Sequence, residues 1–267
     1  MMDITLTQGI ILAVIAIIAG FDFWLEGLYI FRPMIVCTLT GMALGDTTLG
    51  VVAGGLTELA FAGLTPAGGT QPPNPILAGV MTVVLAHTTG SNPSTAIGLA
   101  LPFSFLMQYI ILFYYSIFSV FMQKADKYAE EADTKGFARI TILPMVIVAL
   151  TYGVVVFLSA YVAQEPMKDL VNAMPKWLSH GFEIAGGILP AVGFGLLMKV
   201  MLKGKYLPYL MIGFLAASFI KFGNLLPVAV IGAAAAIYQF YNDKEKAELE
   251  KRVAESGNVG GGYEDGI

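Results

Sequence analysis

Long apolar runs are the feature that most constrains what this chain can fold into. Several stretches are mostly apolar over a length close to the roughly 20 residues that a helix needs to cross a bilayer. Charged residues make up 13% of the 267 residues, about half of their share in an ordinary soluble domain. Because one soluble core cannot bury this much apolar surface, we predict an all-α, polytopic membrane protein. The predicted spans cover residues 4–20, 33–50, 97–122, 140–163, 181–202, 206–220 and 225–241.

Two further apolar runs, 50–64 and 75–90, are short and are interrupted by glycine or flanked by proline. Runs of about 15 residues or fewer fit a re-entrant or interrupted segment better than a full span. We therefore expect broken or re-entrant segments around residues 50–90. Either run could also cross the membrane, or both could enter it and return.

The distribution of lysine and arginine indicates the orientation of the chain in the membrane. Basic residues favour cytoplasmic loops, so we place the loop 123–139, the turn after residue 198 and the tail in the cytoplasm. Only Arg32 precedes Lys124, so charge does not fix the side of the N-terminus. The basic residues of these three places are Lys124, Lys127, Lys135, Arg139, Lys199, Lys203, Lys205, Lys244, Lys246, Lys251 and Arg252.

The stretch 164–180 falls on the outer side in this arrangement. Its apolar residues recur at helical spacing, which predicts a helix lying in the membrane interface with Trp177 at the depth of the headgroups. We favour a packed external cap without a binding role. The apolar residues are Met167, Leu170, Val171, Met174 and Trp177.

The domain organisation that we predict is simple. Residues 1–241 form the membrane-embedded part, and residues 242–267 form a cytoplasmic tail. The tail is charged and then glycine-rich, which is typical of a short helical extension that becomes partly disordered.

Motifs of soluble enzymes are absent from the sequence. It has no Walker sequence, no zincin motif and no nucleophile elbow, and its single cysteine, Cys37, excludes a disulfide framework. No basic stripe suggests nucleic acid, and His87 and His180 are interpreted as interfacial residues. We expect no metal, no cofactor and no enzymatic activity in this chain itself, so that another protein supplies any energy for transport.

The candidate site lies in residues 45–75, where Glu58 interrupts an apolar run. A carboxylate at membrane depth costs about 3 kcal/mol or more on insertion scales and is tolerated when it faces protein or water. The following segment is broken by proline and glycine, and irregular backbone survives at membrane depth only where protein buries it or where it lines a wet cavity. Carboxylate, hydroxyl and amide groups suit a neutral polyol. The candidate binding residues are Glu58, Thr65, Thr70, Gln71, Asn74 and Asp46.

Each of these assignments has an alternative. The segment 65–75 could be an exposed loop, with Glu58 paired to backbone in a helix bundle. Asp46 follows an apolar run and is as consistent with a helix cap as with a ligand. The stretch 181–195 repeats the combination of a carboxylate, Glu183, with glycines and a proline. Here we favour close helix packing by the glycines over a second half-site.

Several stretches closely resemble the IIC subunit of the mannose–fructose–sorbose family of bacterial phosphotransferase systems (PTS). They include residues 21–46, Gly-Gly-Leu-Thr-Glu-Leu at 54–59 and the loop 132–139. The long segment 62–75 resembles the N-acetylgalactosamine and galactosamine branch. The likeness covers essentially the whole chain, including 185–195 and the closing Asp-Gly-Ile.

The resemblance implies a sugar-translocating subunit in the bacterial inner membrane that pairs with a second membrane subunit, IID, in a trimer of such pairs. A soluble IIB subunit, which receives phosphate from IIA, would phosphorylate the sugar during import. The resemblance places the sugar near Glu58, Gln71 and Asn74, with IID completing the site. It does not separate N-acetylgalactosamine from galactosamine.

Two other functions are compatible with the residues alone. The chain could be a secondary transporter that works without partners, although the sequence shows no intramembrane basic residue or carboxylate pair for it. It could also be a structural membrane subunit whose partner makes every ligand contact.

Overall fold

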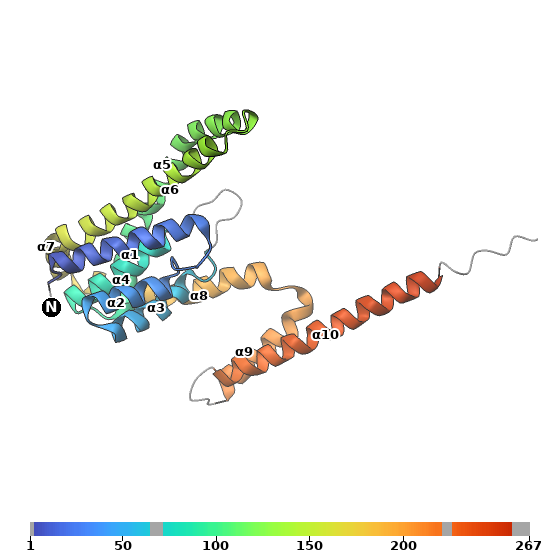
Figure 1. Ribbon diagram of the computed structural model, residues 1–267. Coiled ribbons are helices and arrows are strands. Elements are labelled where there is room, and N and C mark those ends of the chain that lie inside the picture. Colours follow the sequence, from blue (N-terminus) through green and yellow to red (C-terminus); the bar gives the residue numbers. More distant parts are fainter. Residues whose placement is uncertain (1–2, 65–71, 221–225, 258–267) are drawn as a thin grey trace, which may run out of the picture. The chain divides into compact units, whose positions relative to one another are not determined.

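The computed structural model describes residues 3–64, 72–220 and 226–257, and every regular element within these ranges is a helix (Figure 1). The chain divides into two compact units, residues 1–200 and 201–267. The helices of the first unit are α1 (Leu6–Leu25), α2 (Pro33–Leu44), α3 (Thr47–Phe61), α4 (Pro75–Thr89), α5 (Pro93–Glu130), α6 (Thr134–Phe157), a π-helical turn (Leu158–Val162), α7 (Gln164–Ala173) and α8 (Lys176–Met201). The second unit holds a 3₁₀ turn (Gly204–Tyr206), α9 (Leu207–Phe219) and α10 (Leu226–Gly257).

Side-chain caps fix where many of these helices begin. A side-chain oxygen of the residue before the helix accepts a backbone N–H of the first turn in α1, α3, α4, α5 and α6. Each cap satisfies a donor that the helix itself leaves unpaired. The capping residues are Thr5, Asp46, Asn74, Asn92 and Asp133.

Four helical segments in the described part of the chain are long and apolar enough to cross a membrane. They are α1, the first part of α5, α6 together with its π-helical turn, and α8. The predicted all-α membrane architecture is therefore confirmed. The helices α2, α3 and α4 have only 12, 15 and 15 residues, which agrees with the short, broken segments expected around residues 50–90.

The prediction of one span over 33–50 was wrong. Gly45 adopts a left-handed conformation with φ of 82° and ends α2, and Asp46 then caps α3. Glycine tolerates this conformation because it lacks a Cβ. An uninterrupted apolar run is therefore split into two short antiparallel helices.

The core of the first unit surrounds α4. Twelve of the 15 residues of α4 are buried, and the helix contacts α1, α2, α3, α5 and α6. In Figure 1, α1 and α2 lie beside α4 on one side of this group. A helix of 15 residues, too short to cross a membrane, is thus enclosed by protein.

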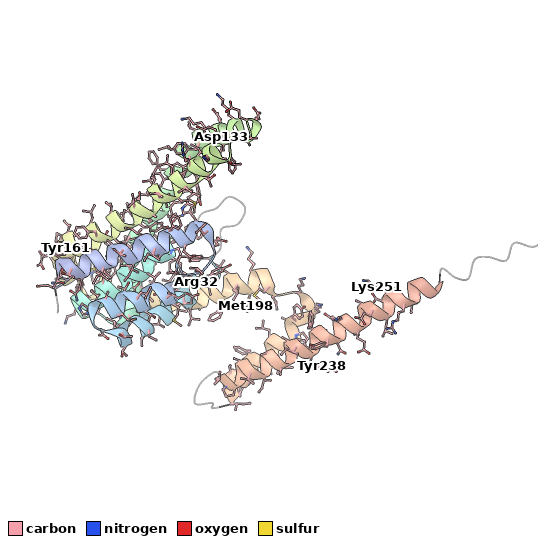
Figure 2. All side chains as sticks on the ribbon, in the orientation of Figure 1. Arg32, Asp133, Tyr161, Met198, Tyr238 and Lys251 are labelled. Carbon is pink, nitrogen blue, oxygen red and sulfur yellow. The ribbon has the colours of Figure 1, made fainter. Side chains whose placement is uncertain are left out.

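The helices α5 and α6 form a long hairpin that extends past the other helices of its unit (Figure 1). The 38 residues of α5 correspond to about 57 Å at 1.5 Å per residue. Helix continues through most of the predicted loop 123–139, with a short turn between Glu130 and Thr134. In that turn Ala132 has φ of 53°, and Figure 2 shows Asp133 at the tip of the hairpin.

The predicted interfacial helix over 164–180 is interrupted. The helix α7 ends at Ala173, and α8 begins at Lys176 after Pro175. Trp177 therefore belongs to the first turn of α8, where its side chain is exposed. Proline at this position starts a new helix because it cannot donate to the preceding turn.

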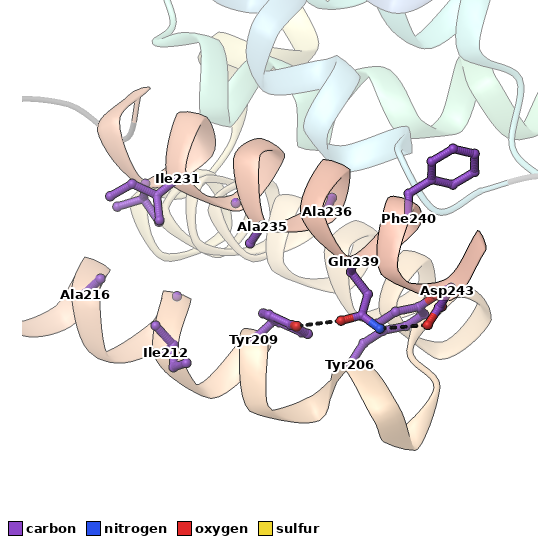
Figure 3. Close-up of a pocket in the computed structure, with 13 residues that line it drawn as sticks. Tyr206, Tyr209, Ile212, Ala216, Ile231, Ala235, Ala236, Gln239, Phe240 and Asp243 are labelled. Atoms are coloured by element: carbon purple, nitrogen blue, oxygen red, sulfur yellow. Dashed lines mark hydrogen bonds between the residues drawn. The ribbon is translucent and has the colours of Figure 1, made fainter. Parts of the chain in front are cut away.

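The second unit is a pair of helices, and α10 continues through the predicted boundary at residue 241. Between α9 and α10 lies a cavity of about 420 Å³ with mostly apolar walls. At one end of it, Tyr209 donates to Gln239 and Gln239 donates to Asp243, both at 2.8 Å (Figure 3). Lys205 binds the same Asp243 at 2.8 Å.

Candidate functional site

A cavity of about 390 Å³ lies where α1 ends, α2 begins and α3 and α4 approach each other. It combines aromatic rings with the charged groups of Glu26 and Arg32. Its lining residues are Phe23, Glu26, Tyr29, Phe31, Arg32, Pro33, Phe61, Leu64, Pro72 and Pro75.

The antiparallel packing of α2 and α3 brings two opposite charges together beside this cavity. The two helices touch through Gly41 and Gly50, where a Cβ on Gly41 would come within 2.6 Å of the Gly50 Cα. Small residues permit this close approach of two backbones. The far ends of the helices then meet, with Arg32 before α2 and Glu58 in the last turn of α3.

Arg32 and Glu58 form an ion pair. The Arg32 Nε lies 2.7 Å from the Glu58 Oε1, and the Arg32 Nη2 also contacts this oxygen. The Glu58 Oε2 accepts the backbone N–H of Met34 at 3.2 Å. The side chains remain 36% and 23% exposed, and Arg32 is the member of the pair that lines the cavity. A carboxylate at this depth is therefore compensated by a cation and a backbone donor.

Sequence reasoning identified Glu58 but missed its partner. Arg32 was counted only as a marker of orientation, and its ion pair with Glu58 was not foreseen. Twenty-six residues separate the two groups, and only the turn at Gly45 brings them together. The Arg-Pro pair at the start of α2 was the available signal, because it places a cation at the start of a helix inside an apolar region.

Asn74 is fully buried, and its polar atoms bind protein. Its side chain donates to the hydroxyl of Tyr152 on α6 and accepts the backbone N–H of Leu77 at 3.0 Å. Its backbone N–H donates to the carbonyl of Ser104 at 3.2 Å, and the Ser104 hydroxyl donates to the Asn74 carbonyl at 2.8 Å. Asn74 therefore joins the start of α4 to α5 and α6.

The other candidate residues fall into two groups. Thr65, Thr70 and Gln71 lie outside the described residues, although Leu64 and Pro72 on either side of that gap both line the cavity. Asp46 is exposed and accepts the backbone N–H of Leu49 at 2.9 Å.

Asp46 is the N-cap of α3, and a ligand role for it stays a prediction. Asp46 and Glu58 are twelve residues apart, which is about 18 Å along a helix. The structure thus places Glu58 against Arg32 of the cavity wall and Asp46 at the opposite end of α3.

Two of the glycines of 181–195, Gly186 and Gly193, serve the close packing that the sequence favoured. A Cβ on Gly186 would collide with the carbonyl oxygen of Ser94 on α5, and one on Gly193 with the carbonyl oxygen of Leu59 on α3. Glu183 accepts from Asn92 at 2.9 Å and lies 3.2 Å from His180. This stretch therefore attaches α8 to α3 and α5.

The chemistry of the cavity suits a ligand with both apolar faces and hydroxyl groups. Aromatic rings from Phe23, Tyr29 and Phe31 offer flat apolar surfaces, with Phe23 and Phe31 packed edge to face at 5.3 Å between centroids. Charged groups beside them can donate to and accept from hydroxyls. Among the described residues, no group of histidine, cysteine, aspartate and glutamate side chains could hold a metal ion.

Comparison with known proteins identifies the family. The family model described as the PTS system sorbose-specific IIC component matches residues 6–238. The chain belongs to this family. It is a multi-pass IIC subunit of a phosphotransferase system, a sugar-permease component of the bacterial cytoplasmic membrane that works with other PTS components.

Relatives of this PTS IIC subunit differ in the sugar that they are named for. N-acetylgalactosamine permease IIC component 1 of Escherichia coli (strain K12) is 59% identical over 267 residues, which cover both chains completely. The mannose-specific EIIC component of the same strain is 29% identical, with 88% of this chain and 89% of the relative covered. The fructose permease IIC component of Bacillus subtilis (strain 168) is 30% identical over 94% of each chain.

Two solved structures share the fold of this PTS IIC subunit. One, described only as a membrane protein, superposes with a TM-score of 0.81 at 27% identity and covers 90% of this chain and 97% of the other. The other belongs to the complex of the mannose transporter ManYZ with microcin E492, with a TM-score of 0.57 at 28% identity and the same coverage.

Proposed function

We propose that this IIC subunit imports an amino sugar of the N-acetylgalactosamine type. The observation that carries the proposal is the 59% identity, over both complete chains, to an N-acetylgalactosamine permease IIC component. Identity to the mannose and fructose subunits is about half as high. The segment 62–75, which resembles the amino-sugar branch, begins and ends beside the cavity.

The partners proposed for the chain are the other subunits of such a system. A IID membrane subunit completes the pathway, in a trimer of IIC–IID pairs, and the ManYZ complex among the similar structures supports a paired arrangement. A soluble IIB subunit phosphorylates the sugar after receiving phosphate from IIA. The IIC subunit itself then supplies binding and passage, and the phosphoryl transfer belongs to IIB.

The sugar-binding role of the cavity rests on the ion pair that Arg32 of its wall forms with Glu58. Sugar hydroxyls can donate to the Glu58 carboxylate and accept from the Arg32 guanidinium, and both groups are partly exposed. Because each neutralises the other, the pair presents strong hydrogen-bonding groups without a net charge of its own. Such a site matches a neutral hexosamine derivative, and the aromatic residues can pack against its ring.

Uptake in cells tests the choice of sugar. Labelled N-acetylgalactosamine, galactosamine and mannose would be supplied to a strain that lacks its own amino-sugar systems and expresses this chain with IID, IIB and IIA. We expect uptake of one or both amino sugars well above that of mannose. Uptake of mannose alone, or uptake without the partner subunits, would contradict the proposal.

Replacing the Glu58 carboxylate tests the site. Glu58→Gln keeps the size of the side chain but removes the charge that binds Arg32, and hydrogen bonds to charged groups contribute about 1.5–3 kcal/mol. We expect uptake at low sugar concentration to fall roughly tenfold or more, with normal protein levels in the membrane. Glu250→Gln, at an exposed position of α10, is the matched control. Full uptake by Glu58→Gln would show that the sugar binds elsewhere.

A further inference from the structure

The connection between α1 and α2, residues 26–32, forms a large part of the cavity wall. It contributes Glu26, Tyr29, Phe31 and Arg32 to the lining. Phe31 is 8% exposed and packs against both Phe23 and Tyr29, with centroid distances of 5.3 and 5.6 Å. The shape of the cavity therefore depends on the conformation of this short connection.

That conformation is not one that the connection would adopt by itself. Glu26 has φ of 47° and Tyr29 has φ of 57°. Left-handed backbone is disfavoured for residues with a Cβ, because the Cβ approaches the carbonyl oxygen too closely. Two such residues within four positions need an interaction from outside the connection to hold them.

Asp22, in the last turn of α1, provides this interaction. Its Oδ1 accepts the backbone N–H of Leu28 at 2.8 Å, and its Oδ2 accepts that of Ile30 at 2.6 Å. Its backbone carbonyl accepts the N–H of Glu26 at 2.7 Å. Asp22 is 5% exposed, so its carboxylate is held away from water and is compensated by these donors.

We propose that Asp22 is a positioning residue for the sugar site, which holds residues 26–32 in the conformation that places Tyr29, Phe31 and Arg32 in the cavity wall. This inference rests on the proposed function of the cavity. Asp22 is not one of the residues that line the cavity. It acts on the sugar through the residues that it orients. Each of its two carboxylate oxygens accepts one backbone N–H group.

Asp22→Asn removes one of the two acceptors at nearly constant size. The amide keeps one oxygen, so either Leu28 or Ile30 loses its partner and residues 26–32 are held less firmly. For the sugar that the assembled wild-type complex takes up best, we expect the apparent KM to rise roughly tenfold. The maximal rate should change less than about twofold, because the residues that handle phosphate lie in another subunit.

The control is Asp133→Asn, which makes the same change at the distant hairpin tip, where a single oxygen, Oδ1, accepts the backbone N–H groups of both Lys135 and Gly136 and can be kept by the amide. We expect its KM to equal that of the wild type. If Asp22→Asn instead lowers the maximal rate at an unchanged KM, or behaves like the control, the positioning role is refuted.

Hydrogen exchange of the purified complex gives a readout that does not involve sugar. The backbone amides of Leu28 and Ile30 should exchange faster in Asp22→Asn and faster still in Asp22→Ala, while peptides from α4 stay unchanged. Unchanged exchange at residues 26–32 would overturn the proposal even if uptake falls. Absence of amino-sugar uptake by the wild-type complex would instead count against the proposed function, and the exchange data and the KM for another transported sugar would still decide the role of Asp22.

Discussion

Single charged residues carry much of the organisation of the candidate site. Asp22 and Glu58 both interrupt apolar sequence, and both are compensated by specific donors. Asp22 binds backbone N–H groups of the following connection, whereas Glu58 binds a guanidinium from another helix. A carboxylate in such a region is tolerated when its hydrogen bonds are complete. The two acidic residues therefore bind residues of the cavity wall or of its connection, one by local and one by long-range contacts.

This difference between local and long-range contacts explains which features of the site the sequence could predict. Glu58 was recognisable because a charge in an apolar run costs free energy and is tolerated only where other groups compensate it. Its pairing with Arg32 was not, because it depends on how closely α2 and α3 pack after the turn at Gly45. Asp22 was missed, although the same argument applies to it. Aspartate near the end of an apolar helix, with a glycine five residues later at Gly27, is a local signal for a turn that the carboxylate stabilises.

For Asp46 the sequence left two roles open, a helix cap and a ligand, and substitutions can distinguish them. Asparagine is as good an N-cap as aspartate, whereas alanine costs about 1 kcal/mol of stability. If Asp46 only caps α3, Asp46→Asn should keep both the unfolding temperature in detergent and the uptake of sugar. Asp46→Ala should lower the unfolding temperature. A loss of uptake in Asp46→Asn at unchanged stability would show that the carboxylate binds a ligand.

At the scale of helices, the lengths of apolar runs predicted the long elements well. The spans α1, α5, α6 and α8 were found because each holds enough apolar residues to cross the bilayer. The division of 33–50 into two helices was not found, because glycine occurs both inside membrane helices and at their ends. Which role Gly45 plays is decided by the packing of the helices on either side.

Neighbouring glycines of α8 allow a sharp test of helix packing. A Cβ on Gly186 would overlap the Ser94 carbonyl oxygen, which is backbone and cannot move aside, whereas nothing lies within 4 Å of a Cβ on Gly187. Gly186→Ala should therefore destabilise the protein by about 1–3 kcal/mol. Gly187→Ala should leave it unchanged or stabilise it by up to about 1 kcal/mol. Thermal unfolding in detergent measures both, and equal effects would contradict the packing of α8 on α5.

At the scale of the molecule, contacts within the first unit indicate on which side of the membrane the N-terminus lies, which charge alone left open. The N-terminal residues bind α7, since Lys168 pairs with Asp3, and the Ile4 N–H donates to Gln164 at 2.9 Å. The Lys168 ammonium holds the pKa of the Asp3 carboxyl below its usual value, so the pair stays charged at neutral pH. The span from Thr134 to Val162 covers 29 residues, or about 44 Å, which separates α7 from the hairpin tip by more than the hydrocarbon core.

The N-terminus and the tip of the α5–α6 hairpin should accordingly lie on opposite sides of the membrane. Since basic residues place the tip in the cytoplasm, the N-terminus faces outward. Thr7→Cys and Lys127→Cys, both at exposed positions, can be tested with a membrane-impermeant maleimide. In spheroplasts Thr7→Cys should react at once and Lys127→Cys only after the membrane is opened, while the buried native Cys37 provides an unreactive background. Labelling of both from the same side would be incompatible with the contacts between the N-terminus and α7, because the 29-residue span from Thr134 to Val162 separates α7 from the hairpin tip.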